Sequence, residues 1–242
     1  MEISQYQFLL GDLKIPIYKP PHIPNETLES VMACTKFKEW GNSLDTNSLE
    51  ISRLSILNVF MFGKIVGFVD LVLDATLKSG KTNVKIPGYV FLRGGAVAML
   101  MILNKEFVIL TKQFRIPAGK FLLEAPAGML DESGDFKGVA AKEIEEECGI
   151  HINVKDLKDL GYIHSSPGGS DEKIHLFSID ITLTEEELKN VLNQIHGADH
   201  EGESIELKII NFNKKEILAT NDSKLISAAF AYETLNNFTI KY

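Results

Sequence analysis

Four glutamates fall within five consecutive positions of this chain: Glu143, Glu145, Glu146 and Glu147. On a helix, residues three and four apart share a face, so Glu143 lies on the same face as Glu146 and Glu147. Carboxylates stacked there repel one another, and near a helix C-terminus the helix dipole adds to the cost. A divalent cation with oxygen ligands offsets that repulsion. The alternative is a solvated Glu-rich helix face, which is the commoner origin of such a cluster.

The cluster belongs to a longer frame that runs from Gly128 to Ile150. In the pattern G-x5-E-x7-R-E-U-x-E-E-x-G-U, where U is aliphatic, seven of the nine specified positions match. The matching positions are Gly128, Glu143, Ile144, Glu146, Glu147, Gly149 and Ile150. This pattern is the Nudix box, and the chain therefore resembles the Nudix hydrolases.

The resemblance implies a metal site. In Nudix hydrolases the positions of Glu143 and Glu147 bind the metal ions, and the position of Glu146 commonly contributes. The carbonyl of the residue before the leading glycine, here Ala127, often completes the shell. We expect Mg²⁺, with Mn²⁺ as an alternative, because such ions neutralise phosphates and lower the pKa of bound water.

Two positions depart from the box: Lys142 replaces its arginine and Gly134 replaces its first glutamate. In the family these two side chains pair and brace the helix. Lys142 keeps the positive charge but loses the planar fork of a guanidinium. A carboxylate nearby in sequence can replace the missing one, and the candidates are Asp131, Glu132 and Asp135.

The flanking segments TKQFRIPAGKFLLEAPAGML (111–130) and SSPGGSDEK (165–173) resemble the ADP-ribose and ADP-sugar pyrophosphatase branch, in its plant-type form. The branch implies substrate contacts for a set of residues outside the box. They are Arg93, Arg115, Glu124, Pro167, Gly168, Gly169 and Glu172.

Each of these positions also has an ordinary structural interpretation. A planar guanidinium suits phosphate oxygens, the role we favour for Arg115, and the alternative is a surface salt bridge. Glu124 suits a structural hydrogen bond as well as a substrate or metal contact. Pro167, Gly168 and Gly169 are typical of a plain turn.

A general base is still needed, and this branch takes it from a loop after the box. The segment GADHEGESIELK (197–208) supplies Glu201, with Glu203 as the second candidate and His200 as the third. Its glycines and small polar residues suit a loop that closes over substrate.

The elements that must position these residues follow from periodicity and cap signals. We predict an extended, proline-rich arm at 16–24 rather than a central strand, then a helix from about 25 to 40. Strands, the box helix (136–148), a helix at 185–195 and a last helix opened by Asp222 or Ser223 complete the chain. The predicted fold class is α+β, and the resemblance implies a Nudix α/β/α sandwich with a mixed sheet. A smaller β-rich domain (1–85) precedes the Nudix domain (86–242).

Composition narrows the class of protein. With a net charge of −8 among 242 residues, binding of nucleic acid is not expected as the main role. No long apolar run predicts a membrane span, and the N-terminus lacks the features of a signal peptide. Cys34 and Cys148 are expected as reduced, buried thiols, and a cytoplasmic location fits best.

Residues 1–85 can also serve for pairing in a homodimer, as in some relatives. Trp40, the only tryptophan, belongs either to the core or to a base-stacking position at that interface.

Two functions of different classes compete. The first is a Mg²⁺-dependent diphosphatase that splits ADP-ribose, ADP-glucose or a similar nucleotide sugar, with UDP-glucose as an alternative substrate. The second, suggested by Gly134 and Lys142, is a protein that binds a nucleotide sugar without hydrolysing it. The choice of sugar and base is not determined by the residues.

Overall fold

The structure, a computed structural model, describes residues 1–79, 82–130, 135–197 and 204–242. The chain divides into two compact units. The first comprises Met1–Gly94 and Ser166–Glu172, and the second comprises Gly95–Ser165 and Lys173–Tyr242. The division after Gly94 lies beyond the residue 85 expected from the sequence, because the strand at 89–92 pairs with the first unit's sheet.

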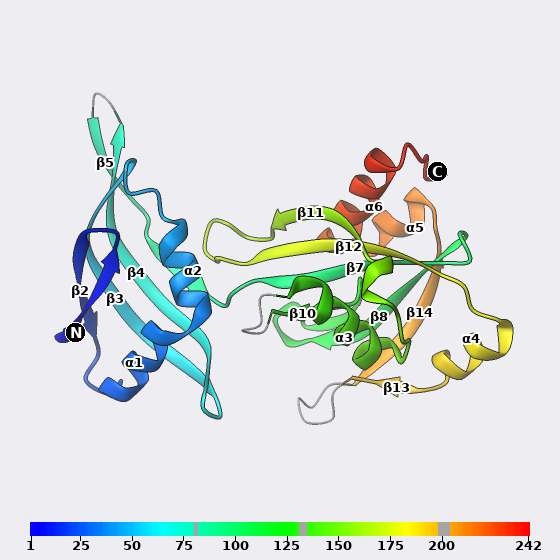
Figure 1. Ribbon diagram of the computed structural model, residues 1–242, viewed down its shortest axis with the longest axis horizontal. Helices are drawn as coiled ribbons and strands as arrows, with labels where there is room; N and C mark the ends of the chain where they lie inside the picture. Colours follow the sequence, from blue (N-terminus) through cyan, green and yellow to red (C-terminus); the bar gives the residue numbers. More distant parts are fainter. Residues whose placement is uncertain (80–81, 131–134, 198–203) are drawn as a thin grey trace. The chain divides into compact units, whose positions relative to one another are not determined.

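The first unit is a β-sheet with two helices. Its elements are β1 (Glu2–Leu10), β2 (Leu13–Lys19), α1 (Asn25–Ala33), α2 (Thr35–Ser43), β3 (Leu49–Phe62), β4 (Ile65–Ser79), β5 (Thr82–Ile86) and β6 (Tyr89–Leu92). The strand order is β1-β2-β3-β4-β5, with β6 paired to β4 (Figure 1). Leu28 and Val31 of α1 and Phe37 of α2 join the strands in one core.

Two predictions for this unit were wrong. The proline-rich segment is not a free arm: β2 lies between β1 and β3, with Pro16 opposite Gln7. It joins β3 only through Ile17 and Tyr18, so the prolines lie outside the ladder with β3. The predicted helix 25–40 is two helices, because Cys34 between them has an extended backbone.

The second unit is a mixed sheet between helices. Its strands are β7 (Ala96–Leu103), β8 (Phe107–Arg115), β9 (Lys120–Glu124), β10 (Ala127–Met129), β11 (Lys158–His164), β12 (Lys173–Ile181), β13 (Ile195–His196) and β14 (Ile205–Asn211). Its helices are α3 (Phe136–Cys148), α4 (Glu185–Leu192), α5 (Lys214–Ala219) and α6 (Ser223–Leu235), with short 3₁₀ turns η1 (Ile116–Ala118) and η2 (Val154–Asp156).

The sheet order is β11-β12-β7-β8-β14-β13, and β10 and β9 pair with β7 and β8 (Figure 1). In this sheet the β12–β7 pair is parallel, whereas the other pairs among its described strands are antiparallel. The predicted α+β class with a mixed sheet is confirmed. The predicted helix 185–195 ends earlier, at Leu192, and the chain then forms the short strand β13.

Strand β7, with the sequence AVAMLMIL, is buried on both faces. Ala98 and Leu100 pack in the core that contains α6, whereas Val97 and Met99 pack in the core that contains α3. An unbroken apolar run is typical of a strand covered on both sides. This sandwich holds α3, the box helix, against the centre of the sheet.

Cys34 and Cys148 are buried and form no disulfide, as expected. In the part of the chain that the structure describes, no helix is long and apolar enough to span a membrane.

Candidate active site

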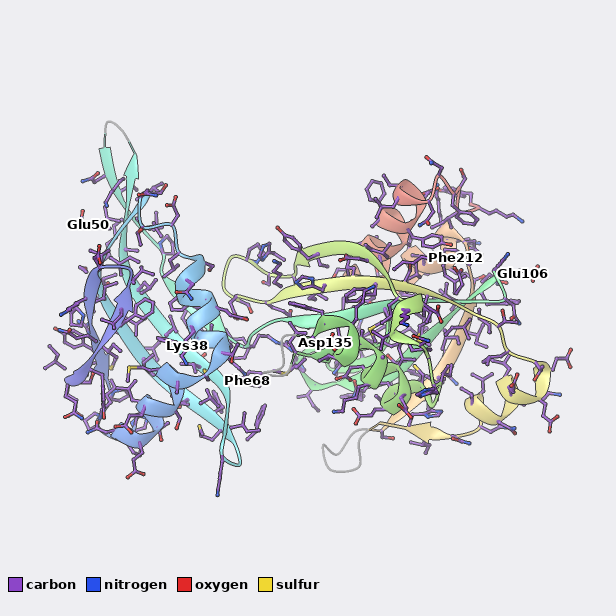
Figure 2. All side chains as sticks on the ribbon, viewed as in Figure 1. Lys38, Glu50, Phe68, Glu106, Asp135 and Phe212 are labelled. Atoms are coloured by element: carbon purple, nitrogen blue, oxygen red, sulfur yellow. The ribbon has the colours of Figure 1, made fainter. Side chains whose placement is uncertain are left out.

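The box helix has the predicted limits because both of its ends are capped. The side chain of Asp135 accepts a hydrogen bond from the Gly138 N–H at 3.0 Å, at the start of α3 (Figure 2). At the other end Gly149 adopts the left-handed conformation (φ 64°), which glycine reaches without strain. Asp135, one of the candidates to replace the missing box carboxylate, is therefore the N-cap of α3.

One face of α3 packs on the sheet. Val139, Ala140 and Ile144 are buried there, as the periodicity predicts, and Cys148 joins them. Burial, reinforced by the neighbouring Glu147, raises the pKa of the Cys148 thiol well above its ordinary value. A protonated, buried thiol of this kind is a packing group rather than a nucleophile.

Glu143 lies directly against the backbone of Gly128 in β10. A Cβ added to Gly128 would be only 1.9 Å from the Glu143 carboxyl carbon and 2.0 Å from its Oε1. A side chain at this position would displace the Glu143 carboxylate, so the leading glycine of the box lets the carboxylate reach the strand.

Glu147, one turn further along α3, approaches the same strand. Its side chain is buried, with 4% of the residue exposed, and its Oε2 accepts a hydrogen bond from the Ala127 N–H at 2.9 Å. A buried carboxylate needs such a donor or a cation nearby. Two carboxylates from successive turns of α3 therefore converge on Ala127 and Gly128.

Glu146 and Glu145 have other partners. Glu146 forms an ion pair with Lys142 at 3.4 Å, and its backbone carbonyl accepts from the Gly197 N–H at 3.1 Å. Glu145 is largely exposed and lies 3.5 Å from His151. Lys142 is thus a partner of Glu146, while Gly134, which replaces the first box glutamate, lies outside the described residues.

Among the described residues, no group of three or more His, Cys, Asp or Glu side chains has the arrangement of a metal cluster. The acidic residues Asp131, Glu132, Glu201 and Glu203, together with His200, lie outside the described residues. The two carboxylates that approach β10, from Glu143 and Glu147, are oxygen donors, and oxygen donors suit a hard divalent cation.

Arg115 and Glu124 form a direct ion pair between β8 and β9. The Arg115 Nε donates to Glu124 Oε2 at 2.7 Å, and Lys224 of α6 donates its Nζ to Glu124 Oε1 at 2.9 Å. Burial raises the pKa of the Glu124 carboxyl, but Lys224 and Arg115 outweigh it, so the pKa lies below its ordinary value. Glu124 thus remains ionised near neutral pH.

The burial of Lys224 is not predictable from the sequence, because a lysine in the first turn of a helix carries no local signal for burial. Its side chain is 14% exposed and lies 3.0 Å from Asp222 Oδ1. Burial lowers the pKa of Lys224, but Asp222 and Glu124 more than compensate, and the pKa is raised.

The SPGGSDE loop belongs to the first unit with β6. The turn at Pro167–Gly169 is closed by the Gly169 N–H on the Ser166 carbonyl, and the Gly169 carbonyl accepts from the Phe91 N–H at 2.7 Å. Arg93 forms an ion pair with Glu172 at 3.2 Å. Arg93 Nε is buried without a hydrogen-bond partner among the described residues.

Asp171, which the sequence reading did not single out, accepts from the backbone N–H groups of Arg93 and Gly94 at 2.8 and 3.1 Å. Burial raises the pKa of its carboxyl despite these bonds. Asp171 therefore fixes the backbone of Arg93, while Glu172 pairs with its side chain.

Trp40 packs in the core of the first unit. Its ring stacks on Phe8 at 6.0 Å between centroids and lies 5.8 Å from Phe37. The packing accounts for this residue, and its base-stacking role stays a prediction.

A family model for the NUDIX domain matches residues 92–227. The chain is 36% identical over 217 residues to Nudix hydrolase 14, chloroplastic, of Arabidopsis thaliana. The match covers 81% of this chain and 69% of the relative. It is 30% identical over 199 residues to the ADP-ribose pyrophosphatase of Bacillus subtilis (strain 168), covering 81% of this chain and 93% of the relative.

A crystal structure of an ADP compounds hydrolase resembles the chain with a TM-score of 0.53 at 15% identity, covering 81% of this chain and 97% of the other. At that identity the likeness shows the fold alone. The residues that the family model matches include β10 and the whole of α3. The chain belongs to the Nudix hydrolase family.

Proposed function

We propose that the protein is a Mg²⁺-dependent diphosphatase of nucleoside diphosphate sugars, with Mn²⁺ as an alternative metal. ADP-ribose, ADP-glucose or a similar compound is hydrolysed to a nucleoside monophosphate and a sugar phosphate. The observation that carries the proposal is the convergence of Glu143 and Glu147 on Ala127 and Gly128.

The residues of α3 and β10 are proposed to bind the metal. Glu143 and Glu147 hold the divalent metal, with the Ala127 carbonyl and Glu146 as further candidates. When bound, Mg²⁺ neutralises the diphosphate and activates water near neutral pH. Because Glu147 accepts from the Ala127 N–H, helix α3 and strand β10 are joined beside the proposed metal ligands.

Arg115 supports a diphosphate substrate. Its Nε donates to Glu124, a bond that does not use the terminal nitrogens of the guanidinium. A planar fork matches two phosphate oxygens. Water attacks one phosphorus, the bridging P–O bond breaks, and the attacking water passes its proton to the general base, for which Glu201 and Glu203 remain the candidates.

The choice of an adenine nucleotide is supported by the names of relatives. The Bacillus subtilis relative is an ADP-ribose pyrophosphatase, and a mouse relative, 30% identical over 132 residues and 53% of this chain, is an ADP-sugar pyrophosphatase. Arg93, Glu172 and the Pro167–Gly169 turn are proposed to contact the substrate. UDP-glucose remains the alternative.

The test is incubation with Mg²⁺ and a panel of ADP-sugars, UDP-sugars, NADH, dinucleoside polyphosphates and oxidised nucleotides, with products separated by chromatography. We expect AMP and a sugar phosphate from ADP-ribose or ADP-glucose, and no product after the metal is chelated. No turnover of any diphosphate would reject the proposal. Metal-independent binding of ADP-ribose without hydrolysis would instead support the non-catalytic alternative suggested by Gly134 and Lys142.

A further inference from the structure

Four charged side chains form a network of ion pairs between the sheet and the start of α6. Arg115 binds Glu124, Glu124 binds Lys224, and Lys224 binds Asp222, at 2.7, 2.9 and 3.0 Å. The side chains of Glu124, Lys224 and Asp222 are 10%, 14% and 5% exposed. The side chain of Arg115, at the end of the network, is 39% exposed. The network therefore ends in a guanidinium that reaches solvent.

Lys224 holds Glu124 in place, and Glu124 in turn holds Arg115. Both oxygens of Glu124 are engaged, one by Arg115 and one by Lys224, so the carboxylate is held from two sides. Because Arg115 is bound through Nε, the plane of its guanidinium follows the position of Glu124. A change in Lys224 would therefore alter the direction of the Arg115 terminal nitrogens without touching them.

Asp222 connects the same network to the segment that leads into β10. It caps α6 by accepting from the Lys224 and Leu225 N–H groups, and its Oδ2 also accepts from the Ala125 N–H at 2.8 Å. Ala125 lies two residues before Ala127, whose N–H binds Glu147. The short segment from Glu124 to Ala127 is thus held by α6 at one end and by α3 at the other.

We propose that Lys224 is a positioning residue for the diphosphatase reaction: through Glu124 it orients Arg115 toward the diphosphate of the substrate. This inference rests on the proposed function. A buried ion pair in itself contributes little net stability, because desolvation opposes the attraction. A positioning role accounts for placing a lysine under a carboxylate that already has an arginine partner.

The experiment compares Lys224→Met with wild-type protein, using Mg²⁺ and ADP-ribose as the probe. We expect KM to rise by about 10- to 100-fold while kcat changes by less than about threefold, because misplacement of Arg115 weakens binding of the diphosphate. Lys224→Arg, which keeps the charge, restores most of the affinity. Lys158→Met is the matched control, since it breaks an exposed ion pair with Asp180 elsewhere in the unit and leaves KM unchanged.

A double-mutant cycle with Arg115→Ala separates positioning from simple support of the fold. Once Arg115 is absent, Lys224→Met should raise KM no further, whereas additive effects would contradict the inference. Should Lys224→Met fail to fold, the isosteric Glu124→Gln takes its place in the cycle with the same expectation.

The two proposals fail in different ways. Wild-type protein that hydrolyses no diphosphate of the panel would reject the proposed function. Active wild-type protein with an unchanged KM in Lys224→Met would reject the role of Lys224 alone.

Discussion

At the scale of single residues, the decisive feature is the space beside Gly128. The Glu143 carboxyl occupies the volume where any other residue would have its Cβ. The box glycine is therefore needed for a close approach of side chain to strand and not for an unusual φ. This is a physical reason why a glycine stands fifteen residues before a glutamate.

Gly128→Ala tests that reason. The added methyl group lies 1.9 Å from the Glu143 carboxyl carbon, so the carboxylate must move away from β10. We expect the Mg²⁺ concentration for half-maximal activity to rise by roughly 10-fold or more, the effect of disturbing the surroundings of a metal ligand. Gly11→Ala, in the turn between β1 and β2, is the control, because nothing lies within 4 Å of its added Cβ and no proposed site residue belongs to that turn. Equal Mg²⁺ dependence in wild type and Gly128→Ala would contradict the contact.

At the scale of elements, the site depends on how α3 is held. The frame from Gly128 to Ile150 predicted this helix to the residue, because its N-cap, apolar face and C-terminal glycine are local signals. The capping box Thr184–Glu187 likewise predicted where α4 begins. Local chemistry in the sequence is sufficient for such elements.

Other parts of the structure carry no local signal. Lys224 pairs with Glu124, one hundred residues earlier in the chain, and nothing around it in the sequence indicates burial. Pro16 argued against a central strand, yet β2 forms one because its pairing with β3 is confined to Ile17 and Tyr18. Asp171 resembles any loop carboxylate until its bonds to the backbone of Arg93 and Gly94 are seen. Long-range contacts of this kind are fixed only by the fold.

Removing the cap of α3 tests the link between helix and site. Asp135→Ala should cost about 1 kcal/mol of unfolding free energy, the usual value for an N-cap, measured by urea denaturation. Thr184→Ala should cost a similar amount in α4. Only the α3 variant should need more Mg²⁺ for half-maximal activity, because only α3 carries Glu143 and Glu147. The same loss of metal affinity in both variants would mean that global stability, not the helix, controls the site.

At the scale of the whole molecule, the chain comprises two units, and the Nudix match covers mainly the second. The first unit exposes large apolar side chains at the turn between β3 and β4, where Phe60, Phe62 and Ile65 are 48%, 54% and 66% exposed. Exposed apolar clusters of this kind are typical of interaction surfaces. The pairing role of residues 1–85 stays a prediction that this surface supports.

We therefore expect a homodimer in solution, with twice the 27.0 kDa mass of the chain. Light scattering coupled to size exclusion measures that mass directly. Phe62→Ser is expected to shift the population toward single chains by removing apolar area, while Leu218→Ser, an exposed leucine on α5, serves as the control. A wild-type mass of one chain at micromolar concentration would contradict the prediction.

The central claim is that α3 presents a metal site through Glu143 and Glu147, and Glu147→Gln tests it most directly. The amide keeps an oxygen for the Ala127 N–H but loses the charge, so folding should be retained. The measurement is the Mg²⁺-dependent rate of ADP-ribose hydrolysis in Glu147→Gln and in Glu145→Gln, an exposed neighbour on the same helix. We predict a loss in kcat of at least about 100-fold for Glu147→Gln and a change of less than about twofold for Glu145→Gln. A folded Glu147→Gln protein with wild-type activity would show that the metal site lies elsewhere.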